Sequence, residues 1–424
     1  MNRLYALIPL AATLLASACS NSGSDEVEPA VQADQVRSVK RGVAFNYQLP
    51  DDVDLLKSGV SWSYNWGPDQ IEEFDRLTVE AGIDFCPMAW NGDFDSDRIR
   101  AWVAAHPGCR YVLAFNEPNL TDQCDYTPAQ AAARWPQLKS LAAELGLRIV
   151  SPAMNYGTKE GYSDPVVWLD EFFSMVPVDD VCAIALHCYM GNAQAMASFV
   201  ERFAKYGKPI WMTEFCAWEQ FITNSQAQMN YMSDAVNYLE SNPDVERYAW
   251  FIPRGAEAEN SYPYMFLLSK SQPTALTDCG KVYVNMSSFD KSVWYTKGLP
   301  IPAEHYANCN MSETTATQWC ESVRLRPTTD TTGVLELTSF RTGKWVEYQV
   351  DANRCSSLTL RYQSILEAQI SIGIDGDKSD VMTLSGTGGE WRTAVLDIKG
   401  LDGRHTLRIG MEKGNINLNT IQID

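Results

Sequence analysis

The stretch YVLAFNEP at residues 111–118 decides how this chain is interpreted. It begins as an apolar run typical of a buried strand and ends abruptly in Asn116-Glu117-Pro118. A second stretch, IWMTEF at 210–215, repeats the pattern with Glu214 near its end. Because alternate residues of a strand point to the same side, we expect each acid to share a face with the apolar residues before it. The expected faces are Leu113, Phe115 and Glu117 in the first stretch, and Ile210, Met212 and Glu214 in the second. An acid on an apolar face costs free energy to bury, so both acids are candidate functional groups.

These two stretches belong to a series of eight strand-like runs within residues 40–286. The runs are 42–47, 60–66, 85–91, 111–117, 148–153, 183–189, 209–215 and 248–253. Helices are predicted between several of them: from Thr127-Pro128 to 145 with Gly146 as its stop, over 192–206 closed by Gly207, and over 224–239. Strands that alternate with helical crossovers predict a (β/α)8 barrel. The alternative is a doubly wound open sheet, which is disfavoured because no glycine-rich phosphate loop follows the first run.

After residue 286 the helical period disappears and Thr, Ser and β-branched residues dominate. Short strands are predicted at 343–350, 357–362, 368–374, 391–398, 405–409 and 416–423, separated by turn signals such as Asp375-Gly376. This pattern predicts an antiparallel, jelly-roll-like β-sandwich. The expected domains are therefore a barrel at 39–288 and an all-β sandwich at 289–424.

The first residues are typical of a targeting segment. Arg3 precedes an apolar run at 4–15, and small residues at 16–18 lead to Cys19. This arrangement resembles a bacterial lipoprotein signal at 1–18 whose cysteine is lipidated. The alternative is an ordinary secretory signal. The polar tract that follows predicts a flexible tether over 19–38. We expect the protein in the bacterial cell envelope, lipid-anchored, or secreted.

Composition narrows the classes of partner. The chain has 424 residues and a formal net charge of −19, which disfavours nucleic acid because phosphates require a basic surface. We expect contact with a membrane only through the lipid anchor, and a monomer. No CxxC pair is present among the 11 cysteines, so a zinc site is disfavoured.

The residues at the strand ends suit the cleavage of a glycosidic bond. Active residues of barrels come from the carboxyl ends of the strands, which places Glu117 and Glu214 at one rim. One carboxylic acid can protonate a leaving oxygen while the other attacks carbon or activates water. Trp62, Tyr64, Trp66, Trp90, Asn91, His187, Tyr189 and Trp250 lie at or near other strand ends, where flat rings can stack on sugar faces. We expect the pKa of Glu117 to be raised for its acid role, and no cofactor for catalysis.

As a set, these residues resemble glycoside hydrolase family 128, of the retaining clan with its acid on strand four and its nucleophile on strand seven. The matching pieces are RGVAFN at 41–46, SWSYNW at 61–66, FCPMAW at 85–90, FNEPN at 115–119, SPA at 151–153, HCY at 187–189 and WMTEF at 211–215. The family acts on β-1,3-glucans. The resemblance implies Glu117 as acid/base and Glu214 as nucleophile. It implies substrate contacts at Asn46, Tyr64, Trp66, Trp90, Asn116, His187, Tyr189 and Trp250, with Asn116 on the 2-hydroxyl and Trp250 under the sugar.

The C-terminal part resembles a family 6 carbohydrate-binding module. The similar pieces are IPAEHY at 301–306, GKWVEY at 343–348, GGEWRT at 388–393 and NLNTI at 417–421. The resemblance implies sugar binding at Trp391 and Asn417 and a structural calcium ion at Glu304 and Asp424. The Gly-Tyr pattern usual before the second piece is missing here, so the alternative is a domain that only buttresses the barrel.

The leading hypothesis is an endo-acting, retaining β-1,3-glucanase. A second is a glycan-binding surface lipoprotein on an inactive barrel, although both carboxylates are present. A third is an exo-acting enzyme, or a glycosidase of the same clan that cuts another β-glucan or mannan.

Overall fold

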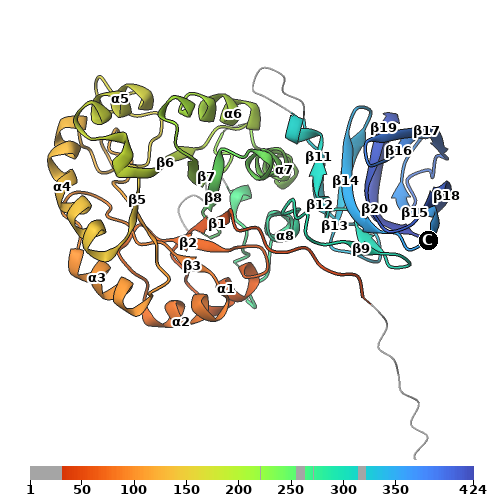
Figure 1. Cartoon of the computed structure of the whole chain (residues 1–424), viewed down its shortest axis with the longest axis horizontal. Coiled ribbons are helices and arrows are strands. Elements are labelled where there is room, and N and C mark those ends of the chain that lie inside the picture. Colours follow the sequence, from red (N-terminus) through yellow and green to blue (C-terminus); the bar gives the residue numbers. More distant parts are fainter. Residues whose placement is uncertain (1–30, 220, 255–262, 271, 314–320) are drawn as a thin grey trace, which may run out of the picture. The chain divides into compact units, whose positions relative to one another are not determined.

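Eight parallel strands form the first part of the structure (Figure 1). The structure is a computed structural model, and it describes residues 31–424 except 220, 255–262, 271 and 314–320. The strands are β1 (Arg41–Ala44), β2 (Trp62–Tyr64), β3 (Asp84–Phe85), β4 (Tyr111–Leu113), β5 (Arg148–Val150), β6 (Val181–Cys188), β7 (Ile210–Phe215) and β8 (Val245–Phe251). Their order is β3-β2-β1-β8-β7-β6-β5-β4. A parallel bridge between Met88 and Leu113 joins the two ends of this order, so the sheet curls back on itself as a barrel requires.

Helices alternate with these strands, and Figure 1 shows α1 to α6 along the outside of the sheet. They are α1 (Pro50–Leu56), α2 (Glu72–Glu80), α3 (Ser96–Ala105), α4 (Pro128–Leu145), α5 (Pro165–Met175), α6 (Ala193–Glu201), α7 (Ser225–Ser241) and α8 (Asp278–Asn285). The three predicted helices are present, but the one predicted over 192–206 ends at Glu201, and a separate 3-10 turn at Ala204–Tyr206 leads to Gly207. Thr127 caps α4 by accepting from the Gln130 N–H, and Gly146 ends it with a left-handed φ of 69°. Among the described residues, no helix has the length and apolar character needed to cross a membrane.

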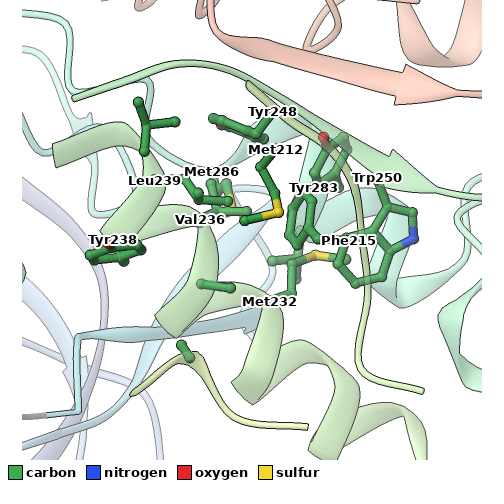
Figure 2. Close-up of a cluster of buried hydrophobic side chains, with 14 of the residues drawn as sticks. Met212, Phe215, Met232, Val236, Tyr238, Leu239, Tyr248, Trp250, Tyr283 and Met286 are labelled. Carbon is green, nitrogen blue, oxygen red and sulfur yellow. The ribbon is translucent and has the colours of Figure 1, made fainter. Parts of the chain in front are cut away.

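Two layers of apolar side chains lie on either side of the curled sheet. The inner layer fills the barrel and includes Trp62, Leu113 and Trp211. The outer layer packs the strands against the helices, and Figure 2 shows one part of it, where Met212 and Trp250 meet α7 and α8. Which of these two layers a residue joins decides whether its side chain can reach the inside of the barrel.

The C-terminal part is β-rich, as predicted. It contains β9 (Tyr295–Thr296), β10 (Ile301–Pro302), β11 (Asn308–Cys309), β12 (Arg324–Pro327), β13 (Leu335–Arg341), β14 (Trp345–Asp351), β15 (Cys355–Gln363), β16 (Ala368–Ile374), β17 (Asp377–Leu384), β18 (Arg392–Leu401), β19 (Arg404–Lys413) and β20 (Asn415–Ile423). One six-stranded sheet has the order β12-β13-β20-β15-β18 with β10 on β20, and the other has β11-β14-β19-β16-β17 with β9 on β14. The arrangement in two sheets supports the predicted β-sandwich. The jelly-roll-like topology of that sandwich stays a prediction. The predicted ranges correspond to β14, β15, β16, β18, β19 and β20, whereas β9 to β13 and β17 were not among them.

Helix α7 joins the barrel to the β-rich part through buried polar side chains. Asn237 donates to Ser322 Oγ at 2.9 Å and to the Val323 carbonyl at 3.1 Å, and accepts from the Tyr306 hydroxyl at 2.7 Å. Asp234 accepts from Arg324 at 2.9 Å. The junction is therefore held by specific hydrogen bonds rather than by apolar contact alone.

The tether predicted at 19–38 is partly corrected. Gln32 donates to the Thr296 carbonyl at 3.0 Å, and Gln35 donates to the Met286 carbonyl at 3.2 Å. Arg37 donates to the carbonyls of Lys57 and Ala81. Residues 32–38 are thus bound to the folded chain, because their side-chain amides and guanidinium find backbone acceptors that composition alone does not reveal. The signal at 1–18 and Cys19 lie outside the described residues.

Candidate active site

Glu117 follows β4 in a strained backbone conformation. Its φ is 43°, in the left-handed region that side chains with a β-carbon rarely adopt. Backbone hydrogen bonds hold it there, from Asn116 N–H to the Trp90 carbonyl at 2.9 Å and from Glu117 N–H to the Ala153 carbonyl at 3.1 Å. Such strain costs free energy, so it persists only where the surrounding structure stabilises it. Residues strained in this way are typical of functional positions.

Glu214 reaches the site through a β-bulge in β7. On the β6 side, Leu186 pairs with Met212 but His187 pairs with Glu214, so one extra residue, Thr213, lies between the two pairs. A bulge changes the side to which the following residues point. Met212 therefore packs outside the barrel (Figure 2), while Glu214 turns toward His187.

The expected shared strand faces are therefore wrong in both stretches. Met212 lies in the outer layer and Glu214 does not. In β4, Leu113 lies in the inner layer, but Phe115 makes edge contacts with Tyr126 and with Trp135 of α4 on the outside. The two acids meet because the strands are irregular at their ends, and not because alternation continues to them.

Three donors surround the Glu214 carboxylate, which is 3% exposed. The Tyr64 hydroxyl donates to Oε1 at 2.7 Å, and the Trp66 indole N–H donates to the same oxygen at 2.8 Å. The Tyr189 hydroxyl donates to Oε2. Hydrogen bonds to a carboxylate favour its ionised form and fix its orientation. The predicted site residues Tyr64, Trp66 and Tyr189 are thus all brought to one carboxylate.

His187 connects the two acids. Its Nδ1 lies 2.9 Å from Glu117 Oε1 and 3.5 Å from Glu214 Oε2. The ring is buried, and its Nε2 has no hydrogen-bond partner among the described residues. Asn155, which follows β5, donates from Nδ2 to Glu117 Oε1 at 3.2 Å. One imidazole therefore contacts both carboxylates, and Glu117 also accepts a hydrogen bond from Asn155.

Charge and burial shift the pKa values of this cluster. Burial opposes ionisation of Glu117, but His187 and Asn155 outweigh it and hold the pKa of Glu117 below its ordinary value. Burial, with the charge of Glu117 nearby, raises the pKa of Glu214. Burial disfavours the imidazolium of His187, but the two carboxylates prevail and raise its pKa. The expected rise for Glu117 is therefore wrong for the free protein, since His187 stabilises its ionised form.

Trp250 is not part of the site. It is fully buried, donates from Nε1 to the Met265 carbonyl at 2.8 Å, and packs on Phe215 in the outer layer (Figure 2). The neighbouring residue Phe251 points the other way and contacts Trp66 and Tyr189. The end of β8 was predicted correctly as part of the site, but Phe251 and not Trp250 faces it. Neighbouring residues of a strand face opposite sides, so an error of one position selects the wrong side.

The remaining predicted substrate contacts, Asn116, Trp90 and Asn46, differ in their burial and in their distance from the acids. Asn116 is buried and donates to Gln123 Oε1 at 3.0 Å, which leaves its Oδ1 without a partner in the described residues. Trp90 is partly buried and packs against the inner layer, as Trp66 does. Asn46 is exposed after the end of β1, and no described hydrogen bond ties it to either acid. Asn155, Phe251 and Trp218, which stacks on Phe251, were not predicted. Nothing in the short polar segment after β5 singles out Asn155.

In the β-rich part, Trp391 and Asn417 are connected through Gln363. Asn417 donates to Gln363 Oε1 at 2.9 Å, and Gln363 donates to the Gly389 carbonyl, two residues before Trp391. Trp391 is partly exposed and donates to Thr329 Oγ1 at 3.0 Å. The structure therefore connects Asn417 of β20 with the segment just before β18 that carries Trp391, through the side chain of Gln363.

The two predicted calcium ligands, Glu304 and Asp424, have different hydrogen-bond partners. Glu304 is buried and accepts from the Leu335 N–H at 3.3 Å, and burial raises its pKa to about 8. Asp424 instead accepts from Thr359 and Gln422. Within the described part of the chain, no group of three or more acidic, His or Cys side chains could hold a metal ion. The calcium ion therefore stays a prediction.

Two family models match the chain. The model described as "Glycosyl hydrolase catalytic core" matches residues 42–283, and that of "Carbohydrate binding module (family 35)" matches residues 321–423. The resemblance of the C-terminal part to a carbohydrate-binding module is confirmed, but the matched family is 35 and not family 6.

Solved structures and one curated relative extend this similarity. The GH128 subgroup II endo-β-1,3-glucanase of Pseudomonas viridiflava is 37% identical, with a TM-score of 0.54, and the match covers 59% of this chain and 98% of that one. The corresponding enzyme of Sorangium cellulosum is 34% identical, with a TM-score of 0.52 and coverages of 58% and 97%. Alkali-sensitive linkage protein 1 of Schizosaccharomyces pombe is 26% identical over 262 residues, which are 58% of this chain but only 45% of that protein.

The matched region contains both buried glutamates, the bridging histidine and the donors around them. It spans more than half of the chain, from β1 to α8. The chain therefore belongs to the glycosyl hydrolase catalytic core family, with a GH128-like barrel, and it is a glycoside hydrolase.

Proposed function

We propose that this chain hydrolyses β-1,3-glucan by a retaining, endo-acting mechanism, with Glu117 as acid/base and Glu214 as nucleophile. The observation that carries the proposal is the pair of buried carboxylates on one imidazole, with His187 Nδ1 at 2.9 Å from Glu117 and 3.5 Å from Glu214. The substrate is inferred from the two endo-β-1,3-glucanases, at 37% and 34% identity.

The hydrogen-bond partners support this division of roles. Glu214 accepts from Tyr64, Trp66 and Tyr189, which stabilise a carboxylate and hold it in a fixed orientation. A nucleophile needs this arrangement, because it must be ionised and aimed at one carbon. Glu117 has a less crowded carboxyl group, with described donors on Oε1 only.

The first step breaks the bond between the anomeric carbon and the leaving oxygen. A Glu214 oxygen bonds to the anomeric carbon as Glu117 delivers its proton to the leaving oxygen. Substrate bound over Glu117 excludes water and raises the pKa of Glu117 from its low value in the free protein, which permits proton transfer.

The second step restores the protein. Glu117, now ionised, takes a proton from water, and the water oxygen bonds to the anomeric carbon as the ester to Glu214 breaks. Esterification removes the charge of Glu214, so His187 acts on Glu117 alone and favours its ionised, basic form.

Two inversions at one carbon give retention. Retaining enzymes hold their carboxyl groups about 5–5.5 Å apart, compared with roughly 6.5–9.5 Å in inverting enzymes. Contact of both carboxylates with one ring nitrogen supports the shorter spacing.

We further propose that the β-rich part binds glucan at Trp391 and Asn417, which is supported by the family 35 match. The lipid anchor at Cys19, the location in the cell envelope and the monomeric state complete the proposal. They rest on the sequence of the first residues and on composition.

A glucan panel tests the proposal. The protein is incubated with laminarin, a β-1,4-glucan and a mannan, and products are sized over time. A mixture of laminari-oligosaccharides from laminarin is expected, with the β-anomer formed first by proton NMR. Release of glucose alone would contradict endo action, and initial α-anomer would contradict retention.

A second candidate function is glycan capture at the cell surface. It is favoured by the carbohydrate-binding module match over residues 321–423. Binding of laminarin without release of any sugar would support this candidate and contradict hydrolysis.

A further inference from the structure

Asn155 lies beside the proposed acid/base and has no role in the mechanism described so far. It follows β5, where bridges of Asn116 to Ala153 and Met154 to Leu186 continue the sheet beyond the regular strand. Its Nδ2 donates to Glu117 Oε1 at 3.2 Å, and its Oδ1 accepts from the Tyr156 N–H at 2.8 Å. Both ends of the amide are therefore engaged, which fixes the direction of the donor.

The loop that carries Asn155 is held by the motif that carries Glu117. Asn119, which is fully buried, donates to the carbonyls of Asn155 at 2.7 Å and Tyr162 at 3.2 Å. Its own carbonyl accepts from the N–H groups of Thr158 and Lys159. The acid and its amide partner are thus positioned by one interlocked pair of loops.

Gly157 is required for this contact between the loops. A β-carbon at this position would lie 2.3 Å from the Asn119 carbonyl oxygen and 2.4 Å from its side-chain nitrogen. Only glycine leaves room for Asn119 to reach the Asn155 carbonyl. The second loop is therefore built to approach the Asn-Glu-Pro-Asn segment closely.

The two oxygens of Glu117 differ as a result. Oε1 accepts from His187 Nδ1 at 2.9 Å and from Asn155 Nδ2 at 3.2 Å, while Oε2 has no described donor. A carboxyl oxygen that accepts two hydrogen bonds is a poor place for a proton, because the donors already occupy its lone pairs. The proton of the neutral acid is then directed to the other oxygen.

We infer that Asn155 is a positioning residue that, together with His187, reserves Glu117 Oε1 as an acceptor, so that Glu117 gives and takes its proton at Oε2. This inference rests on the acid/base role proposed for Glu117. In the first step the proton leaves Oε2 for the leaving oxygen, and in the second step Oε2 accepts a proton from water. Throughout the cycle Oε1 keeps both donors.

The other groups that face Glu117 act in different ways. His187 from β6 and Glu214 from β7 are titratable groups that act on Glu117 through charge, and the Tyr64 and Tyr189 hydroxyls donate to Glu214. Asn155 is neutral, and of the two acids it contacts only Glu117. Its removal is therefore expected to change the titration of Glu117 and leave that of Glu214 in place.

The test compares Asn155→Ala and Asn155→Asp with wild type, with Thr158→Ala as the matched control. Thr158 lies in the same loop and contacts Thr121 on the exposed side, away from Glu117. Two substrates are used: a laminari-oligosaccharide, whose leaving group needs a proton, and a dinitrophenyl β-glycoside, whose leaving group does not.

With Asn155→Ala, kcat/KM for the oligosaccharide is expected to fall about tenfold or more, with little change for the dinitrophenyl glycoside. The basic limb of the pH profile is expected to move to higher pH by about one unit, since a donor to the ionised form is lost. Asn155→Asp is expected to move it further, because a second carboxylate opposes ionisation of Glu117. Thr158→Ala is expected to match wild type.

A titration of Glu117 separates this inference from the proposed function. Carbon-13 NMR of glutamate-labelled protein, with Glu117→Gln to assign the signal, is expected to give a higher pKa for Glu117 in Asn155→Ala. This readout needs no substrate, so it stands even if wild type cleaves none of the glucans. Unchanged titration, equal losses on both substrates, or the same effects in Thr158→Ala would overturn the inference.

Discussion

At the scale of single residues, the donors around each glutamate distinguish their roles. Glu214→Gln keeps the shape of the side chain but removes the nucleophilic charge, so turnover is expected to fall by more than about a thousandfold. Affinity for laminari-oligosaccharides, measured by calorimetry, is expected to stay near the wild-type value. Activity close to wild type would show that Glu214 is not the nucleophile.

Glu117→Ala removes the proton donor but leaves space beside the anomeric carbon. External azide can enter that space and attack the glycosyl ester on Glu214 when the leaving group is activated. Partial recovery of rate with dinitrophenyl β-glycoside and azide is therefore expected, with a β-glycosyl azide as product. The absence of this product by NMR would contradict either retention or the acid/base role.

His187 gives the site its pH dependence. Its charge lowers the pKa of Glu117 and opposes the rise that burial causes at Glu214. In His187→Gln that charge is lost, both carboxyl pKa values rise, and both limbs of the kcat/KM profile are expected to move to higher pH. His106→Gln is the control, since His106 stacks on Trp102 and pairs with Asp75 instead. A limb that moves to lower pH would contradict this assignment.

At the scale of elements, helix limits were more predictable from sequence than strand ends. Thr127 and Gly146 limit α4, and Asn224 caps α7, because capping depends on residues within one turn of the helix end. The bulge at Thr213 depends on pairing with both β6 and β8, which the sequence of β7 does not contain. Asn155 was missed for the same reason, since its partner is distant in sequence. The eight runs, their order and the two acids could still be predicted from local pattern.

The end of β8 allows a direct test of which side of the strand faces the site. Phe251→Leu keeps bulk but removes a ring that contacts Trp66 and Tyr189, so kcat/KM for laminarin is expected to fall about tenfold. Trp250→Phe loses the hydrogen bond to Met265 and some packing, so the free energy of unfolding is expected to fall by about 2 kcal/mol with little change in kcat/KM. An activity assay measures kcat/KM, and urea denaturation measures the free energy of unfolding. A large loss of kcat/KM in Trp250→Phe but not in Phe251→Leu would contradict the conclusion that Phe251 faces the site.

At the scale of the whole molecule, the barrel and the β-rich part share the buried polar residues of α7. Asn237→Ala leaves the Ser322 and Tyr306 hydroxyls without this partner, so the free energy of unfolding is expected to fall by about 2–3 kcal/mol. Asn230→Ala is the control on the same helix, because Asn230 bonds only to Gln226 among the described contacts. Scanning calorimetry measures both. Equal melting temperatures for the two variants would show that the junction is not held by Asn237.

The family 35 match raises the question of what the β-rich part adds to a barrel that already holds both acids. Trp391 is partly exposed, and Gln363 links the Gly389 carbonyl to Asn417, so the flat ring of Trp391 is the group we expect to stack on a sugar. Trp391→Ala is expected to weaken retention on insoluble β-1,3-glucan about tenfold in a sedimentation assay, with hydrolysis of soluble oligosaccharides unchanged. Trp345→Ala is the control, since Trp345 stacks on Arg408 in the other sheet. If both variants sediment like wild type, the β-rich part only buttresses the barrel through α7, because its best-placed aromatic ring holds no glucan.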